Sequence, residues 1–68
     1  MGNNIKEFRE RKGWSQAELA RQLEVHKSWI HKLETSKAEP TLRMALRMAD
    51  LLECTVEDLF FIEKLTKW

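Results

Sequence analysis

Few residues in this chain could interrupt a helix or cross-link the fold. The 68 residues include one cysteine, one proline and two glycines, and they contain no tyrosine. A single cysteine, Cys54, excludes an internal disulfide, so packing must hold the domain together. No stretch shows the alternating strand formers or the turn dipeptide of a β-hairpin. These shortages predict one small all-α domain over residues 1–68.

Long apolar runs and catalytic motifs are also missing. No run approaches the roughly 18 apolar residues of a membrane span, and Lys6 and Glu7 stand where a secretion signal would be apolar. We therefore expect a cytoplasmic protein without a membrane partner. The sequence offers no glycine-rich phosphate loop and no nucleophile beside a base, so we expect neither an enzyme nor a cofactor. His26 and His31 are five residues apart, about 140° around a helix, which argues against a shared metal ion.

The charge is nearly balanced, with a formal net charge of +1. Balance alone gives weak support for nucleic-acid binding, but the charges are unevenly distributed. Ten basic residues precede Ala49: Lys6, Arg9, Arg11, Lys12, Arg21, Lys27, Lys32, Lys37, Arg43 and Arg47. Five acidic residues follow it: Asp50, Glu53, Glu57, Asp58 and Glu63. One surface can therefore be positive while the whole molecule is almost neutral.

The first half of the chain predicts two helices. Residues 4–12 form a helix that Gly13 ends in the left-handed conformation. A second helix follows Ser15, which with Glu18 makes an S-x-x-E capping box. The apolar residues of this second helix point to one side, and Ala20 is small enough to let another helix cross closely.

The second half predicts three more helices. A helix over 27–34 is followed by a loop over 35–40, because Pro40 bars a helix behind it. The next helix covers 41–52, with an apolar repeat at i, i+3, i+4 and i+7. That repeat consists of Leu42, Ala45, Leu46 and Ala49. A last helix starts after Thr55, capped with Asp58, and includes Phe60; residues 61–68 extend it, form a short strand or fray.

Residues 16–33 carry the most informative pattern, since they predict two short amphipathic helices joined by a tight turn. The apolar positions Leu19, Leu23 and Ile30 share one side. The polar residues of the second helix of the pair point outward and are rich in hydrogen-bond donors: Lys27, Ser28, His31 and Lys32. This is the arrangement that a helix-turn-helix needs to place its second helix in the major groove of DNA.

Residues 5–60 resemble the whole DNA-binding domain of the phage lambda repressor, Cro and Xre family. The elements that carry the resemblance are Ser15-Gln16, Ala20, Ile30, Leu33, Glu34, Pro40-Thr41-Leu42 and Val56-Glu57-Asp58-Leu59-Phe60, in the family's order and spacing. The resemblance implies a five-helix fold and a short stand-alone regulator, with double-stranded DNA as its partner. Where the family has glycine in the turns after the second and fourth helices, this chain has Glu24 and Glu53.

The resemblance also implies roles for individual residues. Those expected to reach base edges are His26, Lys27, Ser28, His31 and Lys32. Those expected on the DNA backbone are Ser15, Gln16, Trp29, Thr35, Ser36 and Lys37. Arg9 and Glu34 are expected to form an ion pair that locks the first helix to the third. For Trp29 two interpretations stay open: packing against the protein, or an indole N–H donated to a phosphate.

The C-terminal residues are unusually apolar for the end of so small a domain. The residues concerned are Phe60, Phe61, Ile62, Leu65 and Trp68. We interpret them as a homodimer interface, which would place two reading helices about 34 Å apart on a pseudo-palindromic operator. The expected function is transcriptional repression by a homodimer at the nucleoid. The alternative is an antitoxin-type module whose apolar end binds a protein partner while the domain regulates its own promoter.

Overall fold

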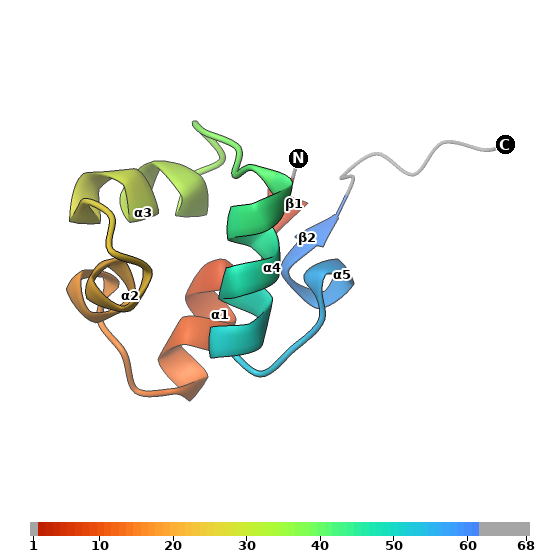
Figure 1. Cartoon of the computed structure of the whole chain (residues 1–68), viewed down its shortest axis with the longest axis horizontal. Helices are drawn as coiled ribbons and strands as arrows, with labels where there is room; N and C mark the ends of the chain where they lie inside the picture. Colours follow the sequence, from red (N-terminus) through yellow and green to blue (C-terminus); the bar gives the residue numbers. More distant parts are fainter. Residues whose placement is uncertain (1, 62–68) are drawn as a thin grey trace, which may run out of the picture.

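The computed structural model describes residues 2–61, and Figure 1 shows their arrangement. Its elements are β1 (Gly2–Asn3), α1 (Ile5–Arg11), α2 (Gln16–Leu23), α3 (Lys27–Glu34), α4 (Leu42–Leu51), α5 (Val56–Leu59) and β2 (Phe60–Phe61). The prediction of a five-helix fold with a central helix-turn-helix is confirmed. The described helices include none with the length and apolar character needed to cross a membrane.

Polar side chains begin the helices, though one cap differs from its prediction. The Oγ of Ser15 accepts from the Glu18 backbone N–H at 3.0 Å, as expected. The Glu18 carboxylate was expected to return to Ser15, but it accepts from Gln22 at 2.7 Å and pairs with Arg21. A charged guanidinium one turn along is a stronger partner than a neutral backbone N–H, and it lowers the pKa of Glu18. The capping box of Thr55 and Asp58 forms in full.

Left-handed residues follow four of the helices, α1 to α4, and the one after α3 is Ser36. Gly13 has a φ of 76°, as predicted. Glu24 and Glu53 have φ values of 60° and 58°. These are the two positions where the family that the sequence resembles is expected to have glycine. A side chain in this conformation costs about 1 kcal/mol relative to glycine. The chain therefore accepts strain in the turns after α2 and α4, as it does at Ser36 after α3.

The core lies where the helices meet. Its fully buried large side chains are Ile5, Leu19, Leu23, Ile30, Leu33, Met48 and Leu59. Trp14 and Cys54 are half-buried and pack against this cluster. Burial raises the pKa of the Cys54 thiol, and the nearby Asp58 carboxylate raises it further. Cys54 therefore behaves as a small apolar residue rather than as an activated thiolate.

The apolar repeat predicted for α4 does not coincide with its buried side. Leu42 is 73% exposed and Leu46 is 54% exposed, so the prediction that they share the inward face is wrong. The buried positions of this part of the chain are Ala45, Met48, Ala49 and Leu52. They also follow a spacing of i, i+3, i+4 and i+7, and Met48 and Leu52 supply the longer side chains. The helix therefore has two apolar stripes of the same period, and the one that contains Met48 and Leu52 is buried in the core.

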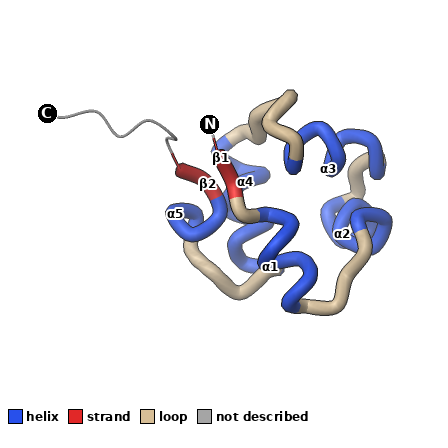
Figure 2. Tube along the Cα trace, turned by 180° about the vertical axis from the view of Figure 1, so that it is seen from behind, coloured by secondary structure: helices blue, strands red, loops and turns tan. Residues whose placement is uncertain are grey.

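A two-stranded antiparallel sheet joins the ends of the described chain. Gly2 pairs with Phe61 and Asn3 pairs with Phe60. Figure 2, seen from behind, shows the two strands side by side in front of α4. The helix after Thr55 was expected to include Phe60, but α5 ends at Leu59 and Phe60 is extended. A strand of two residues is too short to show alternation in the sequence. The Asn4 backbone N–H donates to the Leu59 carbonyl at 2.8 Å and extends this connection.

Candidate nucleic-acid interface

α2 and α3 form a compact helix-turn-helix on one side of the molecule (Figure 1). Ala20 is buried where the two helices meet, and Ile30 and Leu33 of α3 point into the core. The Val25 backbone N–H donates to the Ala20 carbonyl at 3.0 Å and closes the turn. The opposite side of α3 is open, with all of its polar residues exposed: Lys27, Ser28, His31 and Lys32.

His26 caps the start of α3 in a way that fixes its tautomer. Its Nδ1 accepts from the Ser28 backbone N–H at 3.1 Å and lies 2.8 Å from the Ser28 Oγ. A nitrogen that accepts a backbone N–H carries no proton, so the ring proton is assigned to Nε2. The Ser28 hydroxyl then donates its own proton to Nδ1. Outward from the helix, His26 offers a donor and Ser28 offers an acceptor.

The end of α3 is held by a buried ion pair. The Arg9 Nε donates to the Glu34 Oε2 at 2.7 Å, and the Arg9 Nη2 donates to the Glu34 Oε1 at 3.2 Å. The side chains of Arg9 and Glu34 are only 8% and 5% exposed. The Arg9 Nη1 also donates to the Trp14 carbonyl at 2.8 Å. The structure thus contains the ion pair that the resemblance implies, and it ties α1 to α3.

Gln16 joins this pair from the start of α2. Its Nε2 donates to the Glu34 Oε1 at 3.0 Å, and the side chain is half-buried. An amide nitrogen carries two hydrogens, so one donor remains after the bond to Glu34. Ser15 is exposed beside it and uses its Oγ to cap α2. Gln16 can therefore brace α3 and face a phosphate at the same time.

The segment after α3 is more tightly organised than a plain loop. The Thr35 Oγ1 donates back to the His31 carbonyl at 2.9 Å, and the Lys37 backbone N–H donates to the Lys32 carbonyl at 2.8 Å. Ser36 has a positive φ of 62° and, like Lys37, an exposed side chain. Thr35 therefore uses its proton within the protein and presents only lone pairs outward.

Two further side chains, those of Trp29 and Asn3, lie at or beside α3. Trp29 is half-buried and packs against the core, which is the arrangement expected from the packing interpretation. Asn3 is a residue that the sequence analysis missed. Its Nδ2 donates to the Leu33 carbonyl at 2.8 Å, linking β1 to the last turn of α3. The bond spans 30 residues of sequence, so no local pattern could have indicated it.

The sequence-predicted residues thus divide between a surface and a brace. His26, at the N-cap of α3, and Lys27, Ser28, His31 and Lys32 form one exposed polar face, which is called the reading face below after the role proposed for it. Arg9, Gln16 and Glu34 form the brace behind it. Within residues 2–61 no group of three or more histidine, cysteine or acidic side chains is placed to hold a metal ion.

Comparisons with known proteins agree with this geometry. The profile of a family described as a helix-turn-helix domain matches residues 1–59. An uncharacterized HTH-type transcriptional regulator of Archaeoglobus fulgidus is 37% identical over 68 residues, which cover 100% of this chain and 97% of that protein. Relative and chain therefore correspond over nearly their whole lengths.

Solved structures show the same fold. A hypothetical transcription factor NHTF from Neisseria superposes with a TM-score of 0.74 at 33% identity, covering 81% of this chain and 62% of that one. SinR, a master regulator for biofilm formation solved in complex with DNA, gives a TM-score of 0.72 at 29% identity, covering 79% of this chain and 87% of that one. SinR has also been solved in complex with the protein SinI, in a chain of which 53% is covered.

Proposed function

Since this chain belongs to the lambda repressor, Cro and Xre family of helix-turn-helix proteins, we propose that it is a sequence-specific DNA-binding transcriptional regulator. The observation that carries the proposal is the two-sided character of α3. Its apolar side is buried through Ile30 and Leu33, and its polar side is exposed, with no other element of residues 2–61 over it. A helix with this exposure fits the major groove, which admits one α-helix.

The chemistry of the reading face suggests what it reads. Lys27 and Lys32 donate, and the guanine O6 and N7 are the acceptors that lysine prefers. The Nε2–H of His26 is a further donor of the same kind. Ser28 offers an acceptor, which suits the amino group of adenine or cytosine. His31 completes the set of five proposed base contacts.

A second set of side chains is proposed to hold the DNA backbone. The residues are Ser15, Gln16, Trp29, Thr35, Ser36 and Lys37. The first turn of α2 presents backbone N–H groups and a partial positive charge, which favour a phosphate. Gln16 adds its remaining amide hydrogen at that place. For Trp29 the half-buried ring supports packing, and a phosphate bond from its indole N–H stays part of the proposal.

We propose that the protein acts as a homodimer that represses transcription by blocking polymerase at the nucleoid. A single module of this size contacts DNA through a small surface, and a second copy would double it. The predicted interface consists of Phe60, Phe61, Ile62, Leu65 and Trp68. Phe60 is half-buried against the core and Phe61 is 42% exposed, while the other three lie outside the described residues.

Selection of bound sequences from a random DNA pool, at fixed and stated salt, tests the proposal. The expected result is an inverted repeat whose half-sites are about one helical turn apart. A single enriched half-site would support sequence-specific binding by a monomer and contradict the dimer. A folded protein that enriches nothing would contradict the proposed function itself.

A protein partner is the second candidate, because SinR has been solved in complex with SinI. In that case the protein would act as an antitoxin-type module that binds a protein partner and regulates its own promoter. The molecular mass in solution separates the candidates. A stable dimer of the purified chain supports the first, whereas a monomer that becomes soluble and active only with its partner supports the second.

A further inference from the structure

The most exposed of the large apolar side chains in the described residues lie on the outer face of α4. Leu42 and Leu46 are one helical turn apart and are 73% and 54% exposed. Their side chains therefore form one continuous strip along the helix. Burying both leucines in a contact would be favourable, because apolar surface removed from water contributes roughly 25 cal/mol of stabilising free energy per Å². Nothing within residues 2–61 covers this strip.

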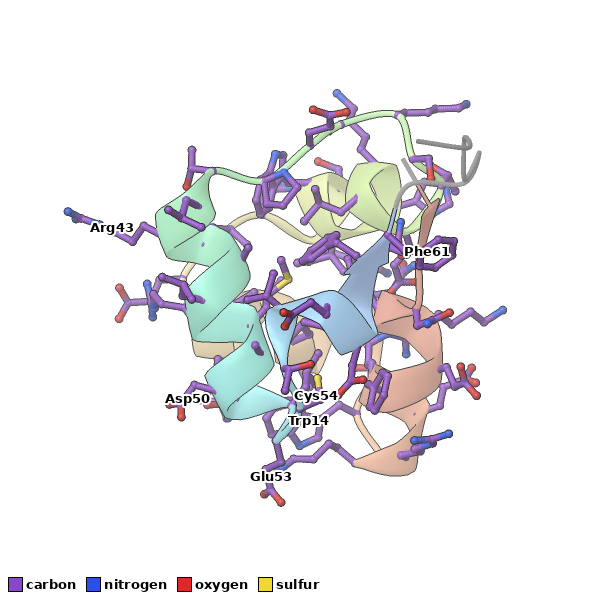
Figure 3. The ribbon with its side chains drawn as sticks, turned by 90° about the vertical axis from the view of Figure 1, so that its right-hand side faces the viewer. Trp14, Arg43, Asp50, Glu53, Cys54 and Phe61 are labelled. Atoms are coloured by element: carbon purple, nitrogen blue, oxygen red, sulfur yellow. The ribbon has the colours of Figure 1, made fainter. Side chains whose placement is uncertain are left out.

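Charged residues border the same strip. Figure 3 shows Arg43 near the start of α4 and Asp50 near its end, both projecting from the outer edge of the helix. They are seven residues apart, which is close to two full turns, so they share one side. Both are exposed, and within residues 2–61 neither takes part in an ion pair. Arg43 and Asp50 thus lie beside the leucines on one side of the strip, with opposite charges about two turns apart.

This pattern is complementary to itself under two-fold symmetry. A two-fold axis perpendicular to α4 brings a second α4 alongside in the antiparallel direction. If the axis passes midway between Leu46 and Arg47, Arg43 and Asp50 lie equally far from it, about 5 Å on either side at ~1.5 Å per residue. Each Arg43 then faces the Asp50 of the second copy, and the two Leu46 side chains meet at the axis. Arg47 lies further around the helix, at the rim.

We propose that the outer face of α4 is a homodimer contact, with a second copy of this chain as its occupant. The inference rests on the homodimer of the proposed function and gives that dimer a surface. Of the surface predicted at the C-terminal end, the described residue Phe61 lies apart from this face, on the far side of α5 from Arg43 in Figure 3. The two surfaces can therefore be tested one at a time.

The test is the oligomeric state of the full chain, measured without DNA by sedimentation equilibrium over a range of concentrations. The expected result is a reversible dimer. Leu46→Glu places two carboxylates at the axis and weakens the dimer by roughly tenfold or more. The matched control, Lys6→Glu, places a carboxylate on the exposed side of α1 and leaves the dimer unchanged. Phe61→Ser separately tests the surface predicted at the C-terminal end. Thermal unfolding of each variant verifies that the domain is folded, as expected for exposed positions.

Charge reversal supplies a second measurement that does not depend on apolar area. Arg43→Asp alone brings two acidic groups together across the axis, and Asp50→Arg alone brings two basic groups together. Each is expected to weaken the dimer, and the double variant is expected to restore it.

The inference is overturned if the wild-type chain stays monomeric at all concentrations. It is also overturned if Phe61→Ser dissociates the dimer while Leu46→Glu does not, or if the double variant restores nothing. The DNA-binding proposal is judged separately, since a monomeric Leu46→Glu chain that still selects a half-site keeps its reading function.

Discussion

Replacing Arg9 by alanine tests whether the buried ion pair holds the domain together. Arg9 is 7% exposed, and its guanidinium makes two bonds to Glu34 and one to the Trp14 carbonyl. Removing it leaves the Glu34 carboxylate buried with the neutral amide of Gln16 as its remaining side-chain partner. The Trp14 carbonyl loses this donor as well. The loss in free energy of unfolding in this variant therefore measures the cost of burying the Glu34 carboxylate without a positive partner.

The expected loss is large compared with the stability of so small a domain. Breaking a buried pair on one side costs about 3–5 kcal/mol, whereas a domain of this length has a free energy of unfolding of roughly 3–10 kcal/mol. At about 4–8 °C per kcal/mol, a loss of ~3 kcal/mol lowers the melting temperature by roughly 12–24 °C. Arg9→Ala is therefore expected to be barely folded at 37 °C.

Urea unfolding followed by circular dichroism measures this loss, with Arg11→Ala as the matched control. Arg11 lies on the same helix, but its side chain is 62% exposed, and it pairs with Glu7 at the surface. Surface pairs of this kind contribute about 0.3–0.5 kcal/mol. The control should therefore move the midpoint only slightly.

A double variant separates the ion pair from the rest of the arginine. Arg9→Met with Glu34→Leu replaces both charges by apolar side chains, and such replacements are often neutral or stabilising. It should recover most of the stability lost by Arg9→Ala. The reasoning is refuted if Arg9→Ala costs no more than Arg11→Ala, or if the double variant is as unstable as the single one.

Four further outcomes are expected. Lys32→Ala should weaken binding by about 1–3 kcal/mol and relax the preference at one base position, measured by titrating variant operators; equal weakening on every sequence would assign Lys32 to a phosphate. Gln16→Ala should weaken binding without altering the selected sequence, and an altered sequence would contradict its backbone role. Glu24→Gly should raise the free energy of unfolding by about 0.5–1 kcal/mol by relieving the left-handed strain, whereas Glu39→Gly in the loop after α3 should not; equal effects would contradict the strain argument. The Cys54 thiol should react with a disulfide reagent more slowly in the folded than in the unfolded chain and faster as the pH rises, because burial raises its pKa; equal rates would contradict its burial.

Local chemistry made most of the helices predictable from the sequence. Ser15, Thr41 and Thr55 each accept a backbone N–H at a helix start, a role that needs only a short side-chain oxygen. Gly13 has the positive φ expected of a helix-ending glycine. Each of these features depends only on residues within about one helical turn, so the local sequence is enough to predict it.

The errors arise where distant groups compete. The sequence offered α4 two apolar stripes, and only the surrounding helices decide that Met48 is buried while Leu46 is exposed. Glu18 had two possible partners, and the charged one prevailed. The pairing of Asn3 with Phe60 joins residues from opposite ends of the described chain. No window along the sequence contains the information for choices of this kind.

The two ends of α3 are held in different ways, so we expect substitutions at the two ends to have different effects on stability and on sequence preference. Its C-terminal end is fixed from three other elements, through Arg9 of α1, Gln16 of α2 and Asn3 of β1. Its N-terminal end is fixed locally, by the bonds between His26 and Ser28. Changes in the brace should therefore disturb the position of the whole helix and the stability together. Changes at His26 should alter the donors and acceptors on the face that we propose reads DNA, while the domain stays folded. Under that proposal, sequence preference can vary at this end without loss of the fold.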